Sequence, residues 1–95
     1  MPARRSQRKV PYGKLVRMDA VCEQHIITNI RITGDFFVHP EEALFSIERE
    51  LNMMRLTGNE EDLARKVGSI VSANGATLIG FGPDDIAYLL RELQC

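Results

Sequence analysis

The feature that most constrains the fold is a change of hydrophobic period between residues 31 and 42. Before this stretch, apolar and polar residues alternate in two runs, as they do along half-buried strands. After it, apolar residues recur every three or four positions, as they do on one face of a helix. Gly34 breaks the alternation, and Pro40 with Glu41 and Glu42 is typical of a first helical turn. Strands followed by helices predict an α+β fold.

Two strands are predicted over residues 14–22 and 25–33, and the alternation assigns a face to each side chain. In the first strand, the inward residues are Val16, Met18, Ala20 and Cys22. In the second strand, they are Ile26, Thr28, Ile30 and Ile32. The opposite face carries Arg17, Val21, Ile27 and Arg31, joined by Phe37 if the parity survives Gly34. A third short strand is expected over residues 36–39.

Three helices are predicted after the strands. The first covers residues 40–55 and ends at Thr57 and Gly58. The second begins at Asn59, a good N-cap, and stops near Gly75, and the third begins at Pro83, which two aspartates follow. Residues 76–81 are interpreted as an extended linker. The result is a small antiparallel sheet of two or three strands with three helices packed on one face, which leaves the other face open.

Length and composition limit the chain to one small domain. It has 95 residues, of which 44% are hydrophobic and 26% charged, as is ordinary for a globular protein. Aromatic residues make up only 6%, too few for a base-stacking platform. No apolar run approaches the ~18 residues of a membrane span, and no apolar stretch follows the basic N-terminus. We therefore expect a cytoplasmic protein without a membrane partner.

The charge is unevenly distributed. Residues 1–14 carry five Lys or Arg and no acid, so the remainder carries a net charge of −6. We expect residues 1–9 to form a basic, flexible arm ahead of a domain at residues 10–95. Such an arm is equally typical of nucleic-acid binding and of docking to an acidic partner.

Few residues are suited to catalysis. Phosphate-binding glycine loops, a GxSxG nucleophile motif and CxxC pairs are all absent. Cys22 and Cys95 are predicted to be a buried small residue and an incidental terminal thiol, neither a disulfide framework nor a zinc site. His25 and His39 have the positions of turn or strand-edge residues, and only Asp35 lacks an evident structural role. From the residues alone, the chain is a small binding module with no catalytic residue and no metal.

Several short motifs nevertheless resemble a known family. They are Gly-Lys-Leu-Val at residues 13–16, Thr-Gly-Asp-Phe-Phe at 33–37, Pro-Glu-Glu at 40–42, Ile-Glu at 47–48 and Gly-Phe-Gly-Pro-Asp-Asp-Ile at 80–86. Over residues 10–94, this set resembles the C-terminal accessory domain of lipoate-protein ligase. One departure is Gly82, where serine would be expected before the Pro-Asp pair, and glycine still caps a helix there.

The resemblance implies a fold and a function. The fold would be that of sulfur-transfer and iron–sulfur scaffold proteins, which are SufE/NifU-like. Because the chain starts just ahead of the first motif, it resembles the split enzyme, in which the accessory domain is a separate, B-type subunit. In that enzyme, lipoate and ATP form lipoyl-AMP, and the lipoyl group passes to acceptor domains of 2-oxoacid dehydrogenase complexes or to the glycine cleavage H protein. ATP, magnesium and lipoate would all bind the catalytic partner of this heterodimer, with no cofactor on this chain.

The open sheet face and the corner after it are the expected contact with that partner, because large exposed apolar residues usually mark interaction sites. The residues assigned to this contact are Ile27, Arg31, Gly34, Asp35, Phe36 and Phe37. A second hypothesis places Lys14 near the adenylate, since a lysine beside a glycine is a mobile positive charge.

Two rival functions belong to other classes. A sulfur or iron–sulfur carrier would need several converging thiolates, which two distant cysteines do not supply. A nucleic-acid-binding module would use the basic arm, although the lack of aromatic residues argues against it.

Overall fold

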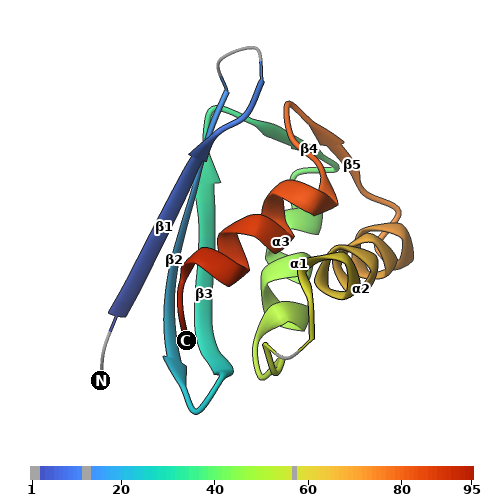
Figure 1. The fold of residues 1–95 in the computed structure, drawn as a ribbon. Coiled ribbons are helices and arrows are strands. Elements are labelled where there is room, and N and C mark those ends of the chain that lie inside the picture. Colours follow the sequence, from blue (N-terminus) through green and yellow to red (C-terminus); the bar gives the residue numbers. More distant parts are fainter. Residues whose placement is uncertain (1–2, 12–13, 57) are drawn as a thin grey trace.

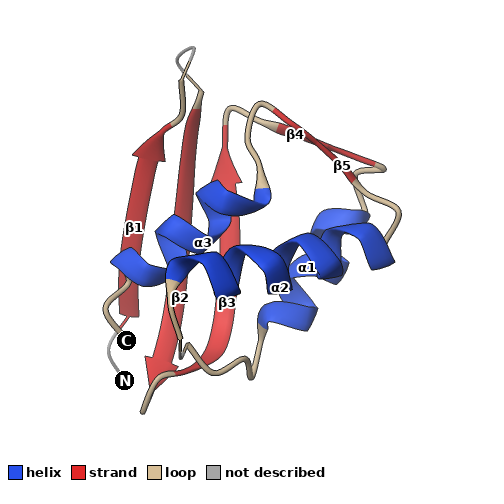
Figure 2. Ribbon diagram, turned by 45° about the vertical axis from the view of Figure 1, so that its right-hand side comes forward, coloured by secondary structure: helices blue, strands red, loops and turns tan. Residues whose placement is uncertain are grey.

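The alternating runs become two neighbouring strands of a sheet. The computed structural model describes residues 3–11, 14–56 and 58–95. Along the chain the elements are β1 (Ala3–Lys9), β2 (Leu15–Glu23), β3 (Ile26–Gly34), β4 (Phe37–His39), α1 (Ala43–Leu51), α2 (Glu60–Ala73), β5 (Thr77–Ile79) and α3 (Pro83–Glu92). Strands β1, β2 and β3 form an antiparallel sheet with β2 in the centre. All three helices lie on one side of this sheet (Figures 1 and 2), so the predicted α+β architecture is confirmed.

The first strand contradicts the prediction of a flexible arm. Residues 3–9 form β1 and pair with β2 from Ala3 opposite Val21 to Lys9 opposite Leu15. The inward side chains of β1 have partners on α3: the Ser6 hydroxyl donates to the carbonyl oxygen of Leu89 at 2.9 Å. Such partners lie far away in sequence, so local composition did not reveal them. Residues 1–2 of the expected arm lie outside the described residues.

A bulge changes the faces of β3. The pairing passes from Val21 opposite Asn29 to Cys22 opposite Ile27, which leaves Thr28 as the extra residue. Ile27 is therefore fully buried on the covered face, and Thr28 is exposed. The prediction that Ile27 lies on the open face and Thr28 on the covered one is wrong, because one inserted residue reverses the parity of the positions before it. The inward faces of β2 and of the second half of β3 are as predicted.

The third short strand exists, but it belongs to a second sheet. β4 pairs antiparallel with β5, with Phe37 opposite Ile79. Residues 77–79 were predicted to be part of an extended linker. They are extended, but they form a strand rather than a linker because β4 supplies their ladder partner. Figure 1 shows this two-stranded sheet beyond the end of β3, beside the helices.

The helices begin and end close to their sequence signals, except for α1. Helix α1 starts three residues after Pro40 and stops at Leu51, so the predicted range of residues 40–55 is too long. The chain after α1 runs extended along β3, where the Ile27 N–H donates to the Met54 carbonyl oxygen at 3.1 Å. Thr57, expected at the end of this helix, lies outside the described residues.

The second and third helices have the predicted caps. The Asn59 side chain accepts the Asp62 N–H at 2.8 Å, at the start of α2. Gly82 precedes α3, and its N–H donates to the Asp85 carboxylate at 2.8 Å. No helix among the described residues has the length and apolar character of a membrane span.

The core lies between the sheet and the helices. Its fully buried side chains come from the inner face of the sheet and from all three helices. They include Met18, Ile27, Ile32, Ile47, Leu51, Leu63, Val67, Ile86, Leu89 and Leu90. This single layer of apolar contact holds the sheet rigid and leaves its outer face free of helical cover.

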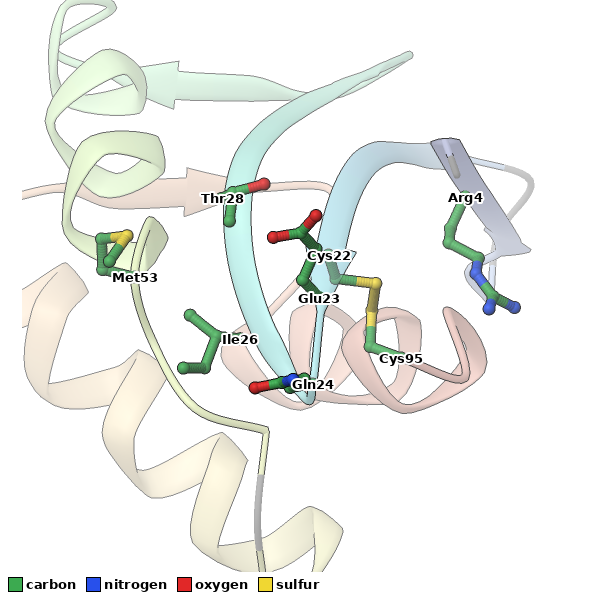
Figure 3. A pocket seen from close by; sticks show the side chains of 8 residues that line it. All are labelled: Arg4, Cys22, Glu23, Gln24, Ile26, Thr28, Met53 and Cys95. Carbon is green, nitrogen blue, oxygen red and sulfur yellow. A yellow bond between two sulfur atoms is a disulfide. The ribbon is translucent and has the colours of Figure 1, made fainter. Parts of the chain in front are cut away.

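A disulfide joins Cys22 and Cys95, so the prediction of two unrelated thiols is wrong. The two Cα atoms lie 5.8 Å apart, although 73 positions separate them in sequence. Helix α3 runs back along the sheet and delivers the last residue to the end of β2 (Figure 1). His25 lies in the turn between β2 and β3, as expected, and its Nδ1 is 2.5 Å from the carbonyl oxygen of Cys95. An open pocket of about 670 Å³ lies at this end of the sheet, and both cysteines, Arg4 and Met53 are among the residues that line it (Figure 3).

Candidate functional site

The corner after β3 requires glycine at residue 34. Gly34 has φ of +147°, and a Cβ placed there would overlap the carbonyl oxygen of Leu15. The same oxygen accepts the Asp35 N–H at 2.9 Å. Close backbone contact with the start of β2 therefore fixes the direction in which the chain leaves the sheet. Asp35 is exposed at this corner, with its backbone rather than its carboxylate held by the fold.

The two adjacent phenylalanines point in different directions, as neighbouring residues of a strand do. Phe36 is half-buried, and its ring centroid lies 4.3 Å from that of Phe81. Phe37 is 67% exposed and lies opposite Ile79, which is 49% exposed. Directly opposed residues share a face, so Phe37 and Ile79 form one exposed apolar patch on the β4–β5 sheet. Phe45 is also exposed, but it lies on α1.

The six residues predicted to contact a partner do not form one surface. Arg31 is exposed on the outer face of β3, and Gly34 with Asp35 lies at the corner. Phe37 lies on the second sheet, Phe36 packs inward, and fully buried Ile27 is excluded from any contact. Two of the three apolar residues predicted on the open sheet face are therefore absent from it, since the bulge removes Ile27 and the corner removes Phe37, and Val21 remains.

Lys14 lies against a segment more than sixty residues away. A Cβ on Gly80 would come within 3.3 Å of Lys14 Cγ and 3.7 Å of Phe36 Cβ. The fold thus brings together the lysine, the corner and the Gly-Phe-Gly segment that opens α3. A cleft of about 470 Å³ lies here, and its charged lining residues are Arg8, Lys14, Asp84 and Asp85. Two cations and two carboxylates make the cleft electrically balanced. Gly13, the neighbour of Lys14 in its motif, lies outside the described residues.

Sequence reasoning missed three parts of this region. Ile79 was assigned to a linker, yet it completes the patch with Phe37. Phe81 covers Phe36, and Arg8 lies over the Tyr88 ring at 4.2 Å and 3.6 Å from Asp85 Oδ1. The sequence signal for the packing of Phe81 was the pair of glycines at residues 80 and 82, because glycines on both sides of an aromatic residue permit close packing.

The described residues hold no cluster of three His, Cys, Asp or Glu side chains that would bind a metal. Both cysteines are joined in the disulfide, so neither is a free thiol. A three-stranded antiparallel sheet covered on one face by helices, with a small second sheet at the corner, defines a compact α+β module with surfaces suited to binding.

One solved structure has a similar fold. The chain is similar to one from a structural analysis of an archaeal lipoylation system, a bipartite lipoate protein ligase and its E2 lipoyl domain from Thermoplasma acidophilum. The TM-score is 0.66 at 23% sequence identity, and the match covers 96% of this chain and 94% of the other. A likeness at this identity establishes a shared fold. No protein-family model matches the chain, and no curated protein matches it significantly in sequence.

Proposed function

We propose that this chain is a non-catalytic accessory subunit of a split lipoate-protein ligase. It docks on the catalytic subunit to form a heterodimer and enables ATP-dependent activation of lipoate to lipoyl-AMP. The lipoyl group then passes to acceptor domains of 2-oxoacid dehydrogenase complexes or to the glycine cleavage H protein. The observation that carries the proposal is the match over nearly the full length of both chains to a chain from an archaeal lipoylation system, which comprises a bipartite lipoate protein ligase and its E2 lipoyl domain.

The arrangement of the motifs supports the same proposal. The segments that resemble the ligase accessory domain are scattered along the sequence, but three of them meet at one corner. Lys14, Phe36 and Gly80 come from the three segments and lie in contact or close to it. A corner built from distant segments is a rigid unit, and rigid units position functional surfaces well.

An accessory subunit can support adenylation without donating a catalytic group. Docking orders the partner's loops around its substrates and excludes water from an acyl-adenylate that water would hydrolyse. We assign ATP, magnesium and lipoate to the catalytic subunit, and we place the heterodimer in the cytoplasm. On this chain, the exposed apolar patch of Phe37 and Ile79 is the proposed contact with that subunit, because its removal from water favours association.

The proposal is tested by mixing the purified chain with a catalytic subunit that lacks its own accessory domain. Size-exclusion chromatography with light scattering should show a 1:1 heterodimer. Two separate peaks at micromolar concentrations of both proteins would contradict the proposed docking.

Lys14 is proposed to approach the lipoyl-adenylate or its phosphates in the heterodimer. Lys14 is exposed and lines the cleft, and its ammonium group is a mobile point charge. A Lys14→Ala heterodimer should form normally but adenylate lipoate about tenfold more slowly, the order expected for the loss of one charge–phosphate contact. Initial rates of lipoate-dependent pyrophosphate release measure this effect. A normal rate would remove the assigned role.

The two rival functions have less support. A sulfur or iron–sulfur carrier needs several thiolates, whereas both cysteines here are joined to each other. A nucleic-acid-binding module would need residues 3–9 as a flexible basic arm, whereas these residues form a strand of the sheet.

A further inference from the structure

Charge is segregated between the two layers of the molecule. Residues 3–34, which include β1 to β3, carry seven Lys or Arg and two Asp or Glu, a net charge of +5. Residues 35–95, which include all the helices, carry five Lys or Arg and eleven Asp or Glu, a net charge of −6. The overall charge of −1 therefore conceals a strongly dipolar protein. Such segregation produces a surface potential that attracts partners of the opposite sign.

The strand register places four of these seven cations on the face of the sheet that the helices do not cover. Figure 2 shows the helices on the other face. The strand register places Arg5, Asp19 and Arg31 in one row across the three strands. The next row is Gln7, Arg17 and Thr33, and Lys9 lies opposite Leu15 beyond it. We name these cations the basic sheet face, which consists of Arg5, Lys9, Arg17 and Arg31. One carboxylate, Asp19, lies among the four, and it is already paired with Arg5 at 2.6 Å.

Arg17 is the member of this face that has a buried hydrogen-bond donor without an acceptor among the described residues. It lies on the central strand, its Nε is buried, and no hydrogen-bond acceptor reaches that atom from residues 3–11, 14–56 or 58–95. Buried donors without acceptors are rare in folded proteins. A carboxylate is the acceptor that best fits a guanidinium group, because the two planar groups form paired hydrogen bonds.

We propose that the basic sheet face docks an acidic protein surface. The three cations free of Asp19 supply the attraction, and the half-buried Arg17 guanidinium group is the proposed partner of an incoming carboxylate. Half-buried Leu15 and Val21 lie among these cations and give the interface apolar contacts as well. This surface is distinct from the apolar patch of Phe37 and Ile79, and the proposal does not depend on the ligase function.

A protein partner fits this face better than nucleic acid does. Every outer-face position of β1, β2 and β3 is described, and none of them is aromatic, so unpaired bases would have no stacking platform. A second copy of the chain would present its acidic helices to the same face and would associate head to tail. Binding of nucleic acid and binding of a second copy each predict results that differ from those expected for an acidic protein partner.

The test uses fluorescently labelled poly-L-glutamate as the acidic polypeptide and measures anisotropy at 20 mM and 200 mM salt. A chain with a net charge of −1 binds this polyanion only through a segregated basic face. We expect the triple variant Lys9→Gln/Arg17→Gln/Arg31→Gln to bind at least tenfold more weakly. The matched variant Arg49→Gln/Arg65→Gln/Lys66→Gln removes the same charge from the helices and should bind within twofold of the wild type. Raising the salt should weaken wild-type binding steeply.

Three results would overturn the proposal: no binding of poly-L-glutamate at low salt, equal effects of the two triple variants, or tighter binding of poly-uridylate than of poly-L-glutamate. Sedimentation of the chain alone decides the remaining alternative. A concentration-dependent dimer that the basic-face variant abolishes would assign the face to a second copy instead. If the triple variant fails to fold by circular dichroism, the single variant Arg31→Glu at an exposed position replaces it, with an expected loss of at least threefold.

Discussion

Replacing Cys95 with serine is expected to lower the free energy of unfolding by about 4 kcal/mol, because the lost crosslink closes a long loop in the unfolded chain. The disulfide joins residues 73 positions apart, so it restricts most of the unfolded polypeptide. For a domain of this size, the loss corresponds to a fall of roughly 20 °C in Tm. Since the chain has no tryptophan, urea unfolding followed by far-UV circular dichroism is the suitable measurement.

The double variant Cys22→Ala/Cys95→Ser is the matched control. It should lose little more stability than the single variant, because the crosslink is already absent. A thiol reductant should destabilise the wild type by a similar amount and leave the single variant unchanged. Equal stability of wild type and Cys95→Ser would contradict a structural role of the disulfide. Persistence of this bond in the proposed cytoplasmic location requires a reduction potential low enough to resist the glutathione pool.

Replacing Phe37 with aspartate is expected to abolish co-purification with the catalytic subunit. Phe37 is 67% exposed, so the change should alter the stability of the isolated domain by about 0.5 kcal/mol or less. At an apolar interface, the same change removes a hot-spot aromatic and buries an unpaired carboxylate, and each effect costs about 2 kcal/mol or more. Affinity-tagged catalytic subunit, co-expressed with either form of this chain, provides the measurement.

Phe45→Asp is the control for this prediction. Phe45 is 70% exposed and aromatic, but it lies on α1 rather than on the β4–β5 sheet. Its replacement should leave the complex intact. Unchanged binding of Phe37→Asp, or an equal loss from both variants, would contradict the assignment of the docking surface to Phe37 and Ile79.

The parts of the fold that depend on local chemistry were predictable. Alternation placed Val16 and Met18 on the covered face of β2 because strand side chains follow a strict period of two. Asn59 and Pro83 marked the starts of α2 and α3 because capping involves residues only a few positions apart. Strand-then-helix order was sufficient for the α+β class.

The parts that failed depend on contacts between distant residues. Thr28 is an extra residue that only pairing with β2 reveals, and it moves Ile27 from the open face to the core. Ser6 lies in a strand that pairs with β2, and its hydroxyl donates to the Leu89 carbonyl oxygen. The pairing of Cys22 depends on where α3 ends. β5 has only three residues, too few for periodicity to identify.

The surface at the candidate site was predictable only in part for the same reason. Phe37 was predicted to be exposed because two adjacent phenylalanines cannot both enter a core that lies on one side. Its neighbour Ile79 was not, because the β4–β5 pairing joins positions 42 residues apart. The motifs around Lys14 and Gly80 were each visible in the sequence, but their contact is a property of the fold alone.

The central claim is that this chain completes the active site of another protein. The most direct measurement follows the formation of lipoyl-AMP from lipoate and radiolabelled ATP with this chain alone, with the catalytic subunit alone and with both together. We predict that lipoyl-AMP accumulates only in the mixture and that this chain alone consumes no ATP. Adenylation by this chain without its partner, or full activity of the catalytic subunit without this chain, would contradict the account.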